Sequence, residues 1–187
     1  MIAPIAAPQR WVSLEAADAE QSTLALWSLA EADALVAEPP AGFAGVYSMR
    51  EIRLPVTAEG TRSASGEAVS ANYFELLGIA PARGRLYSTA PDDSGSATVV
   101  LSDLGWRRLL DADPAALGRV IEIAARPYTV IGIAPPEFTG TTPLNALFWL
   151  RDHDYRRLRP DEVDESLRLE LGGFLADGVS AAQAAAA

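Results

Sequence analysis

The chain of 187 residues contains no cysteine, no lysine and only one histidine. The absence of cysteine excludes disulfides, thiolate-based zinc sites and a cysteine nucleophile. It leaves the compartment open, because exported bacterial domains often lack cysteine. All 15 basic residues are arginine. We attribute this bias to the base composition of the genome rather than to phosphate binding.

Long apolar runs are also missing. No stretch reaches the roughly 18–20 consecutive apolar residues that a membrane helix needs. The apolar segment 1–8 is short, is interrupted by Pro4 and has no basic residue, so it does not have the pattern of a signal peptide. Apolar residues make up 49% of the chain and charged residues 21%, which indicates one ordered globular domain.

The formal net charge of −10 argues against two classes of partner. An acidic surface repels nucleic-acid phosphates and anionic lipid headgroups, so we expect to find neither as a ligand. Arg107 and Arg108 beside Trp106 leave this expectation unchanged. Two arginines on an amphipathic helix of an acidic protein are typical of a solvated face.

Motifs for catalysis or cofactor binding are absent. The chain contains neither a G-x-x-x-x-G-K-[ST] phosphate loop nor the dinucleotide pattern G-x-G-x-x-G. His153 lies in the hydrophilic segment 151–154, where adjacent acidic residues do not converge on one metal ion. Four aspartates are interpreted as parts of a solvated loop or of helix ends: Asp92, Asp93, Asp111 and Asp113. We therefore predict no catalytic site, no metal site and no cofactor.

Strands and helices are mixed along the sequence, which predicts an α+β fold without internal repeats. Extended segments are expected at 10–14, 22–27, 43–56, 67–70, 98–101, 120–123, 128–133 and 167–171, with a short apolar segment at 147–150. Helices are expected at 29–37 after the capping box Ser28–Glu31, at 72–77 before Gly78, after Ser102, and from Ser180 to the end. A longer helix starting at Ser22 is the alternative for the first of these.

Connections are expected where small, polar or turn-forming residues gather. Segment 58–66 is predicted to be a loop, 114–117 a short element ending at Gly118, and 151–164 an exposed charged stretch. The hairpin made by 120–123 and 128–133 has Ala124 and Ala125 where a tight turn requires φ > 0. Alanine resists this conformation, so a looser turn centred on Arg126 and Pro127 is expected.

Four stretches in register resemble the MacB-like periplasmic core domain of ABC-transporter permeases, over about residues 10–187. Residues 69–85 nearly match the family pattern V-S-x-N-Y-F-x-x-L-G-x-x-P-x-x-G-R. The other three are 99–108, 113–140 with the hairpin inside it, and 175–184. The family-motif residues are Ser70, Asn72, Tyr73, Phe74, Leu77, Gly78, Gly84, Arg85, Ser102, Trp106, Gly118, Gly132, Pro135 and Gly178. Their chemistry is structural: side-chain-to-backbone bonds, core packing and tight backbone.

The chain departs from the family at two motifs. Ala124 and Ala125 stand where Asn-Gly is common, and Phe174 and Ala176 replace basic residues of the late motif. Relatives also continue beyond the last helix with a further strand, so the resemblance implies that one lies beyond Ala187.

The resemblance implies a two-lobed domain. Residues 1–66 and 151–187 would form a membrane-proximal lobe of βαβ character, and 67–150 an inserted lobe far from the membrane. Because the domain would lie between two membrane helices, its ends should share one face, and 10–14 and 167–171 should lie in one lobe and one sheet.

The resemblance also implies a function. The domain would lie outside the cytoplasmic membrane and pass on movements driven by a cytoplasmic ABC ATPase subunit, without catalysing a reaction itself. A permease homodimer and a periplasmic protein are the other implied partners. Since such dimers are held through their membrane part, the isolated domain is expected to be soluble and mostly monomeric. The alternatives are a free-standing periplasmic binding or scaffolding module and, from another class, a hydrolase with unrecognised residues.

Overall fold

The computed structural model describes residues 8–18, 23–25, 27–90, 97–160 and 169–185. The strands are β1 Trp11–Leu14, β2 Ala16–Asp18, β3 Thr23–Ala25, β4 Phe43–Thr57, β5 Thr61–Val69, β6 Arg83–Gly84, β7 Thr98–Leu101, β8 Val120–Ile123, β9 Arg126–Ile133, β10 Phe148–Arg151 and β11 Glu170–Leu175. The helices are η1 Pro8–Arg10, α1 Leu29–Ala37, α2 Tyr73–Leu77, α3 Asp103–Leu110, α4 Asp152–Leu158 and α5 Ala181–Ala184. The α+β class is confirmed. Within the described ranges, no helix combines the length and apolar composition needed to cross a membrane.

Six strands of the large sheet close into a ring. The hairpin β4–β5 is joined through β5 to β10, which pairs with β7. Strand β7 then pairs with β9, and the hairpin β8–β9 returns to β4, where Val56 lies opposite Ile123. Closing a sheet on itself leaves no free edge between these strands.

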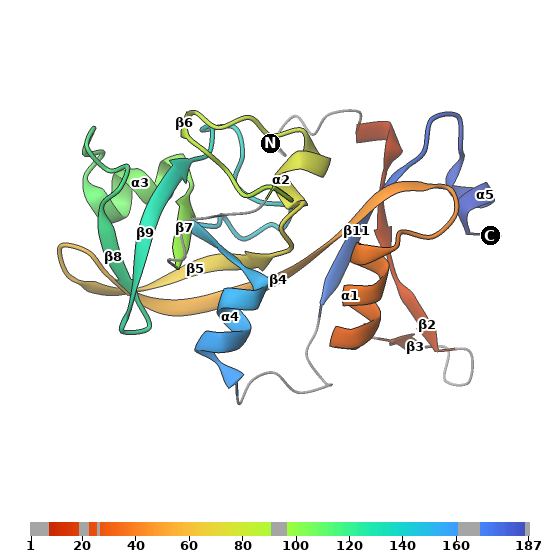
Figure 1. The fold of residues 1–187 in the computed structure, drawn as a ribbon, viewed down its shortest axis with the longest axis horizontal. Coiled ribbons are helices and arrows are strands. Elements are labelled where there is room, and N and C mark those ends of the chain that lie inside the picture. Colours follow the sequence, from red (N-terminus) through yellow and green to blue (C-terminus); the bar gives the residue numbers. More distant parts are fainter. Residues whose placement is uncertain (1–7, 19–22, 26, 91–96, 161–168, 186–187) are drawn as a thin grey trace.

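Strand β4 extends beyond the ring into an open sheet. Its first half pairs with β11, and β11 pairs with β1 in the order β4–β11–β1. Figure 1 shows β4 running along the long axis, with the ring on the left and β1, β11 and α1 on the right. One strand of 15 residues therefore belongs to both parts of the molecule.

Side-chain alternation along β4 divides the core into layers. Ile52, Leu54 and Val56 point into the ring, where they pack with side chains of β7, β8, β9 and α3. Tyr47 and Met49 point to the opposite face, under α2 and the aromatic side chains around it. Val46 packs with Ala32 of α1 and with β11 in a smaller cluster. Successive side chains of a strand point to opposite faces, so alternation along β4 is enough to produce this division.

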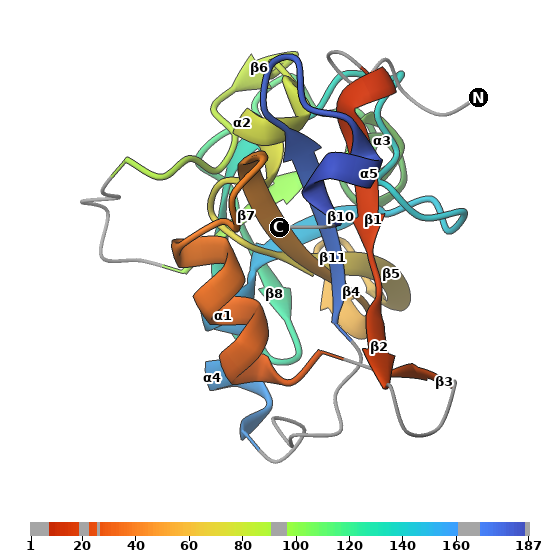
Figure 2. The ribbon, with the colours of Figure 1, turned by 90° about the vertical axis from the view of Figure 1, so that its right-hand side faces the viewer.

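The two described chain ends lie together. Strand β1 is the antiparallel neighbour of β11, with Trp11 opposite Phe174 and Leu14 opposite Leu171. Arg10 donates two hydrogen bonds to the carbonyl oxygen of Leu175, at 2.8 and 2.5 Å. Figure 2 shows β1 and β11 side by side with α5 close to them. The expectation that these two distant segments share one sheet is confirmed.

Most predicted elements have the expected bounds. Helix α1 covers 29–37 and begins with the predicted capping box at Ser28, so the longer helix from Ser22 is wrong. Ser102 caps α3, and Gly78 ends α2 in the left-handed conformation with φ of 69°. The prediction for 22–27 is confirmed at β3, while Ser22 and Leu26 lie outside the described residues, as do 167 and 168 of the late strand.

The predicted loop at 58–66 is wrong, because β5 begins at Thr61. Ser63 and Ser65 point outward, while Ala64 is buried in the ring. The small residues therefore alternate as in a strand, although their composition is typical of a loop. Gly66 is required at its position, since a Cβ there would lie 2.6 Å from the carbonyl oxygen of Phe148. Pairing with β4 stabilises this strand despite its low β-propensity.

Two further expectations need correction. Segment 151–164 was predicted to be exposed, but α4 buries Asp152 and Tyr155, and 161–164 lie outside the described residues. Tyr155 belongs to the apolar cluster inside the ring, and the charged composition of the segment gives no sign of this burial. Segment 114–117 forms turns rather than a helix or strand of its own.

The turn of the β8–β9 hairpin is tight, contrary to the prediction of a looser turn at Arg126 and Pro127. Ala124 and Ala125 are its two central residues, with φ of 48° and 60°, and Ile123 pairs directly with Arg126. Two positive φ angles are those of a type I′ turn, whose twist matches the strands that it joins. Pairing within the ring fixes the ends of β8 and β9, and their register leaves room only for a two-residue turn. Ala124 and Ala125 therefore adopt positive φ at a cost in free energy.

We predict that A124N/A125G stabilises the domain. Each alanine held at positive φ costs about 1–2 kcal/mol, and Asn-Gly is favoured in this turn. The free energy of unfolding in urea should therefore rise by about 2 kcal/mol. The control is A115G. Ala115 is exposed and is not among the alanines with positive φ, so glycine there relieves no strain and should lower the free energy of unfolding through its greater backbone entropy in the unfolded chain. Equal effects of the two changes would contradict the strain at this turn.

Candidate functional site at the junction of the ring and the open sheet

The first family motif ties α2 to β4 at the junction between the ring and the open sheet. The Ser70 hydroxyl accepts a hydrogen bond from the Ser48 backbone N–H (3.1 Å) and donates one to the Asn72 side chain (2.7 Å). Asn72 in turn donates to the carbonyl oxygen of Val46 at 2.8 Å. These bonds satisfy backbone groups of β4 at the end of its pairing with β5, as the sequence pattern predicts.

The apolar residues of this motif form the centre of the aromatic core. Tyr73, Phe74 and Leu77 are fully buried. The Phe74 ring lies edge-on to Trp149, with centroids 5.4 Å apart, and Tyr73 lies edge-on to Tyr47 at 5.0 Å. Helix α2 thereby fixes the outer face of β4 and β10.

The remaining motif residues lie at separate turns and strand ends. Gly84 pairs with Gly132 between β6 and β9, where a Cβ on Gly132 would lie 1.9 Å from the Arg85 carbonyl oxygen. Trp106 donates from Nε1 to the Asp113 carbonyl oxygen at 2.8 Å. The others shape turns or caps: Ser102 accepts from Gly105 N–H, Pro135 accepts from Phe138 N–H, and Gly118 and Gly178 have positive φ. These residues do not converge on one site.

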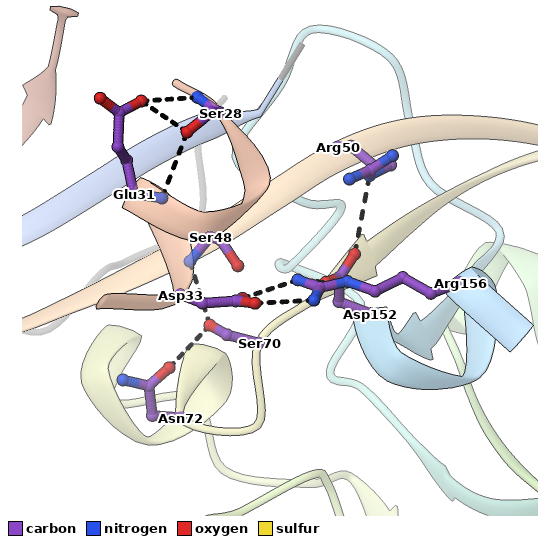
Figure 3. Close-up of polar contacts among 9 residues, drawn as sticks. All are labelled: Ser28, Glu31, Asp33, Ser48, Arg50, Ser70, Asn72, Asp152 and Arg156. Atoms are coloured by element: carbon purple, nitrogen blue, oxygen red, sulfur yellow. Dashed lines mark hydrogen bonds and ion pairs between the residues drawn. The ribbon is translucent and has the colours of Figure 1, made fainter. Parts of the chain in front are cut away.

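A cleft of about 230 Å³ lies beside Ser70, between α1 and α4 on the face of β4 opposite α2. Its lining includes Asp33 of α1, Ser48 of β4, and Asp152 and Arg156 of α4. Figures 1 and 2 show the two helices next to each other on this face, and Figure 3 shows the side chains that meet there.

Charged groups connect the two helices across the cleft. Arg156 donates two hydrogen bonds to the Asp33 carboxylate, both at 2.7 Å, in the bidentate geometry that suits a guanidinium. Arg156 also pairs with Asp152 one helical turn away. The hydrogen bonds to Asp33 are the largest cause that raises the pKa of the Arg156 guanidinium. One arginine thus joins α1 to α4.

Arg50 lies beneath this bridge in the interior. Its side chain is 4% exposed, and its Nε lies 3.6 Å from Asp152 Oδ1. Among the described residues, no group accepts a hydrogen bond from any of its three guanidinium nitrogens, and Asp152 Oδ1 likewise lacks a donor. The guanidinium lies over the Tyr155 ring, 5.4 Å from the centroid. In the part of the chain that the structure describes, Asp152 is the counter-ion of this buried cation, so the junction is sensitive to the loss of that carboxylate.

Of the aspartates and the histidine considered above, the structure describes His153, Asp111 and Asp113, and each of them lies in a local contact at a helix or turn. His153 is 60% exposed and lies 3.1 Å from Asp154. Asp111 ends α3, and Asp113 accepts a hydrogen bond from the Ala115 N–H at 2.8 Å. Asp92 and Asp93 lie outside the described residues. In the part of the chain that the structure describes, no three acidic or histidine side chains are placed to hold a metal ion.

Sequence reasoning missed Arg50 and Asp152. A signal for Arg50 was present, because it follows the same alternation as Ile52, Leu54 and Val56 and therefore points to the same face. Asp152 gave no such signal, since a short charged helix is normally exposed. Only the packing of α4 against the ring shows that its first residue is buried.

Almost the whole chain matches one protein family. Residues 4–187 fit the family model of the MacB-like periplasmic core domain. The chain belongs to this family. No curated protein sequence matches the chain. As a periplasmic core domain of the MacB type, it lies on the extracytoplasmic side of the membrane, in a family of transporter permeases and not in a known class of enzymes.

Solved structures share the fold at low sequence identity. The periplasmic region of MacB from Actinobacillus actinomycetemcomitans has a TM-score of 0.66 and 14% identity, covering 94% of this chain and 78% of that one. The extracellular domain of the noncanonic ABC-type transporter YknZ from Gram-positive bacteria has a TM-score of 0.65 and 14% identity, covering 94% and 86%.

We predict that the two acidic residues of the junction differ in their contribution to stability. D152N leaves buried Arg50 without its counter-ion, so it should lower the free energy of unfolding by about 3 kcal/mol. D33N removes a pair whose carboxylate is half exposed and should cost less than about 1 kcal/mol. R50M/D152N should recover part of the loss. Urea unfolding measures all three, and equal losses for D33N and D152N would contradict the assignment.

Proposed function

We propose that this domain couples ATP hydrolysis by a cytoplasmic ABC ATPase subunit to movement outside the membrane, for export of a substrate or engagement of a periplasmic partner. The domain itself is non-catalytic. The observation that supports this proposal is the Arg10 clamp, formed by Arg10 with the Leu175 carbonyl oxygen and the Asp177 carboxylate (2.6 Å).

The clamp brings the two described ends to one place. An insert between consecutive membrane helices leaves and re-enters the bilayer on the same side, so displacements reach it at both ends at once. Here those ends continue into β1 and β11, which are hydrogen-bonded to each other, and β11 is bonded to β4. A displacement of the ends would thus be passed through backbone pairs to the ring.

The division into lobes belongs to this proposal. Residues 1–66 and 151–187 would form the membrane-proximal lobe, and 67–150 the distal lobe. The boundary at 66/67 lies inside β5, so the two lobes would share a continuous sheet. Motion between them would bend shared strands and change the α1–α4 junction, rather than separate two independent bodies.

The proposed partners follow from the same arrangement. The permease chain would form a homodimer through its membrane part and bind the cytoplasmic ATPase there. A periplasmic protein would meet the part of the ring far from the clamp. The net charge of −10 argues against nucleic acid in this role.

We predict an ATP-dependent change in this domain in the full-length permease assembled with its ATPase in nanodiscs. Hydrogen–deuterium exchange, followed by mass spectrometry, should differ between the nucleotide-free and the ATP–vanadate states in peptides covering β1, β11 and the α1–α4 junction. R10A should reduce the difference, because it releases β1 from Leu175. R126A, in the distal hairpin, serves as the matched control and should leave the difference intact.

The comparison also needs an ATPase variant that cannot bind nucleotide, in which no difference should appear. If every peptide of the domain exchanges equally with and without ATP–vanadate, while the ATPase itself responds, the coupling is refuted.

A further inference from the structure

Glu67 of β5 is a carboxylic acid buried in the aromatic core, on the side of the sheet away from the Arg50 junction. It is 1% exposed. Trp149 donates to its Oε2 at 2.6 Å, Tyr73 donates to the same oxygen at 3.1 Å, and Thr142 donates to Oε1 at 3.3 Å. Gly140 leaves room for it, since a Cβ there would lie 2.4 Å from Oε1.

A chain of hydroxyl groups leads from Glu67 to β1. The single hydroxyl proton of Tyr73 has two acceptors within reach, Glu67 Oε2 and Thr141 Oγ1 at 3.3 Å. Tyr47 accepts a hydrogen bond from Trp11 Nε1 at 2.9 Å. Burial raises the pKa of the Tyr47 phenol, while interaction with Trp11 and with Thr141 lowers this pKa, so Thr141 lies near enough to Tyr47 to act on it. The relay Glu67–Tyr73–Thr141–Tyr47–Trp11 therefore connects the ring to the strand at the chain end.

The surroundings favour a neutral Glu67. Desolvation by burial is the largest cause, and it raises the pKa of Glu67 to about 7 despite the hydrogen bonds from Trp149, Tyr73 and Thr142. Glu51 of β4 is also negatively charged, and its electrostatic repulsion raises the pKa of Glu67 further. Thr142 and Glu51 line a surface hollow of about 260 Å³, so the Thr142 hydroxyl that donates to Glu67 lies between the buried carboxylate and this hollow.

We propose that Glu67 is a proton-binding site whose protonation reverses hydrogen bonds along the relay to Trp11. When Glu67 is charged, Tyr73 donates its hydroxyl proton to the carboxylate, and the Tyr73 oxygen can accept a hydrogen bond from Thr141. When Glu67 takes a proton from solvent, its new O–H is a donor, and the Tyr73 proton turns to Thr141. The Thr141 proton then turns toward Tyr47, which changes the acceptor of the Trp11 indole. This inference does not depend on the coupling to ATP.

The four indole N–H resonances of the 187-residue chain test this inference by ¹⁵N NMR between pH 5 and 9. Those of Trp149 and Trp11 should shift with one common midpoint near pH 7, the value set by burial of Glu67. Trp27 and Trp106 donate to backbone carbonyls of Leu14 and Asp113 and should not follow this transition. They are internal controls in the same sample.

Two variants assign the transition. E67Q should abolish it at both indoles, while H153Q, which removes the only imidazole, should leave it in place. Direct ¹³C titration of the Glu67 carboxyl in the unchanged chain serves if E67Q does not fold. A transition that survives in E67Q, a carboxyl that titrates below pH 5, or a Trp149 shift without a Trp11 shift would each overturn the inference.

Discussion

Backbone pairing along both edges of β4 is the constraint on which the rest of the structure depends. On one edge β4 pairs with β5, and on the other it pairs first with β11 and then with β8. The same strand therefore closes the ring and carries the sheet that holds both chain ends. The tight Ala124–Ala125 turn follows from this constraint, since β8 must meet β4 and β9 in fixed register.

The two faces of β4 have different chemistry at the junction. On one face, Arg50 and Ser48 lie under the bridge between α1 and α4, where a cation is held by few partners. On the other, Tyr47 joins the hydroxyl relay to Glu67. Polar groups buried at a junction are costly to leave unpaired, so both faces suit a region whose packing responds to movement or to protonation.

The elements that could be predicted from the sequence are those with strong local signals. The capping box at Ser28, the Ser102 cap and the alternation of Ile52, Leu54 and Val56 determine their own structure, and the motif at 69–85 identified the family. What could not be predicted depends on pairing across the chain. Strand β5 has the composition of a loop, and Asp152 has that of an exposed helix, so only contacts with β4 and the ring show their roles. Glu67 lies in a strand of small residues, and no local pattern distinguishes a buried glutamate there from an exposed one.

Coincident unfolding of the ring and the open sheet tests the central role of β4 most directly. With 5-fluorotryptophan incorporated, ¹⁹F NMR reports Trp11 in β1 and Trp106 in α3 separately during one urea titration. If β4 joins both parts into one cooperative unit, the two signals should lose intensity with the same midpoint and slope. Two separate transitions, with the Trp11 signal lost while Trp106 stays native, would contradict the claim that the shared strand unites the domain.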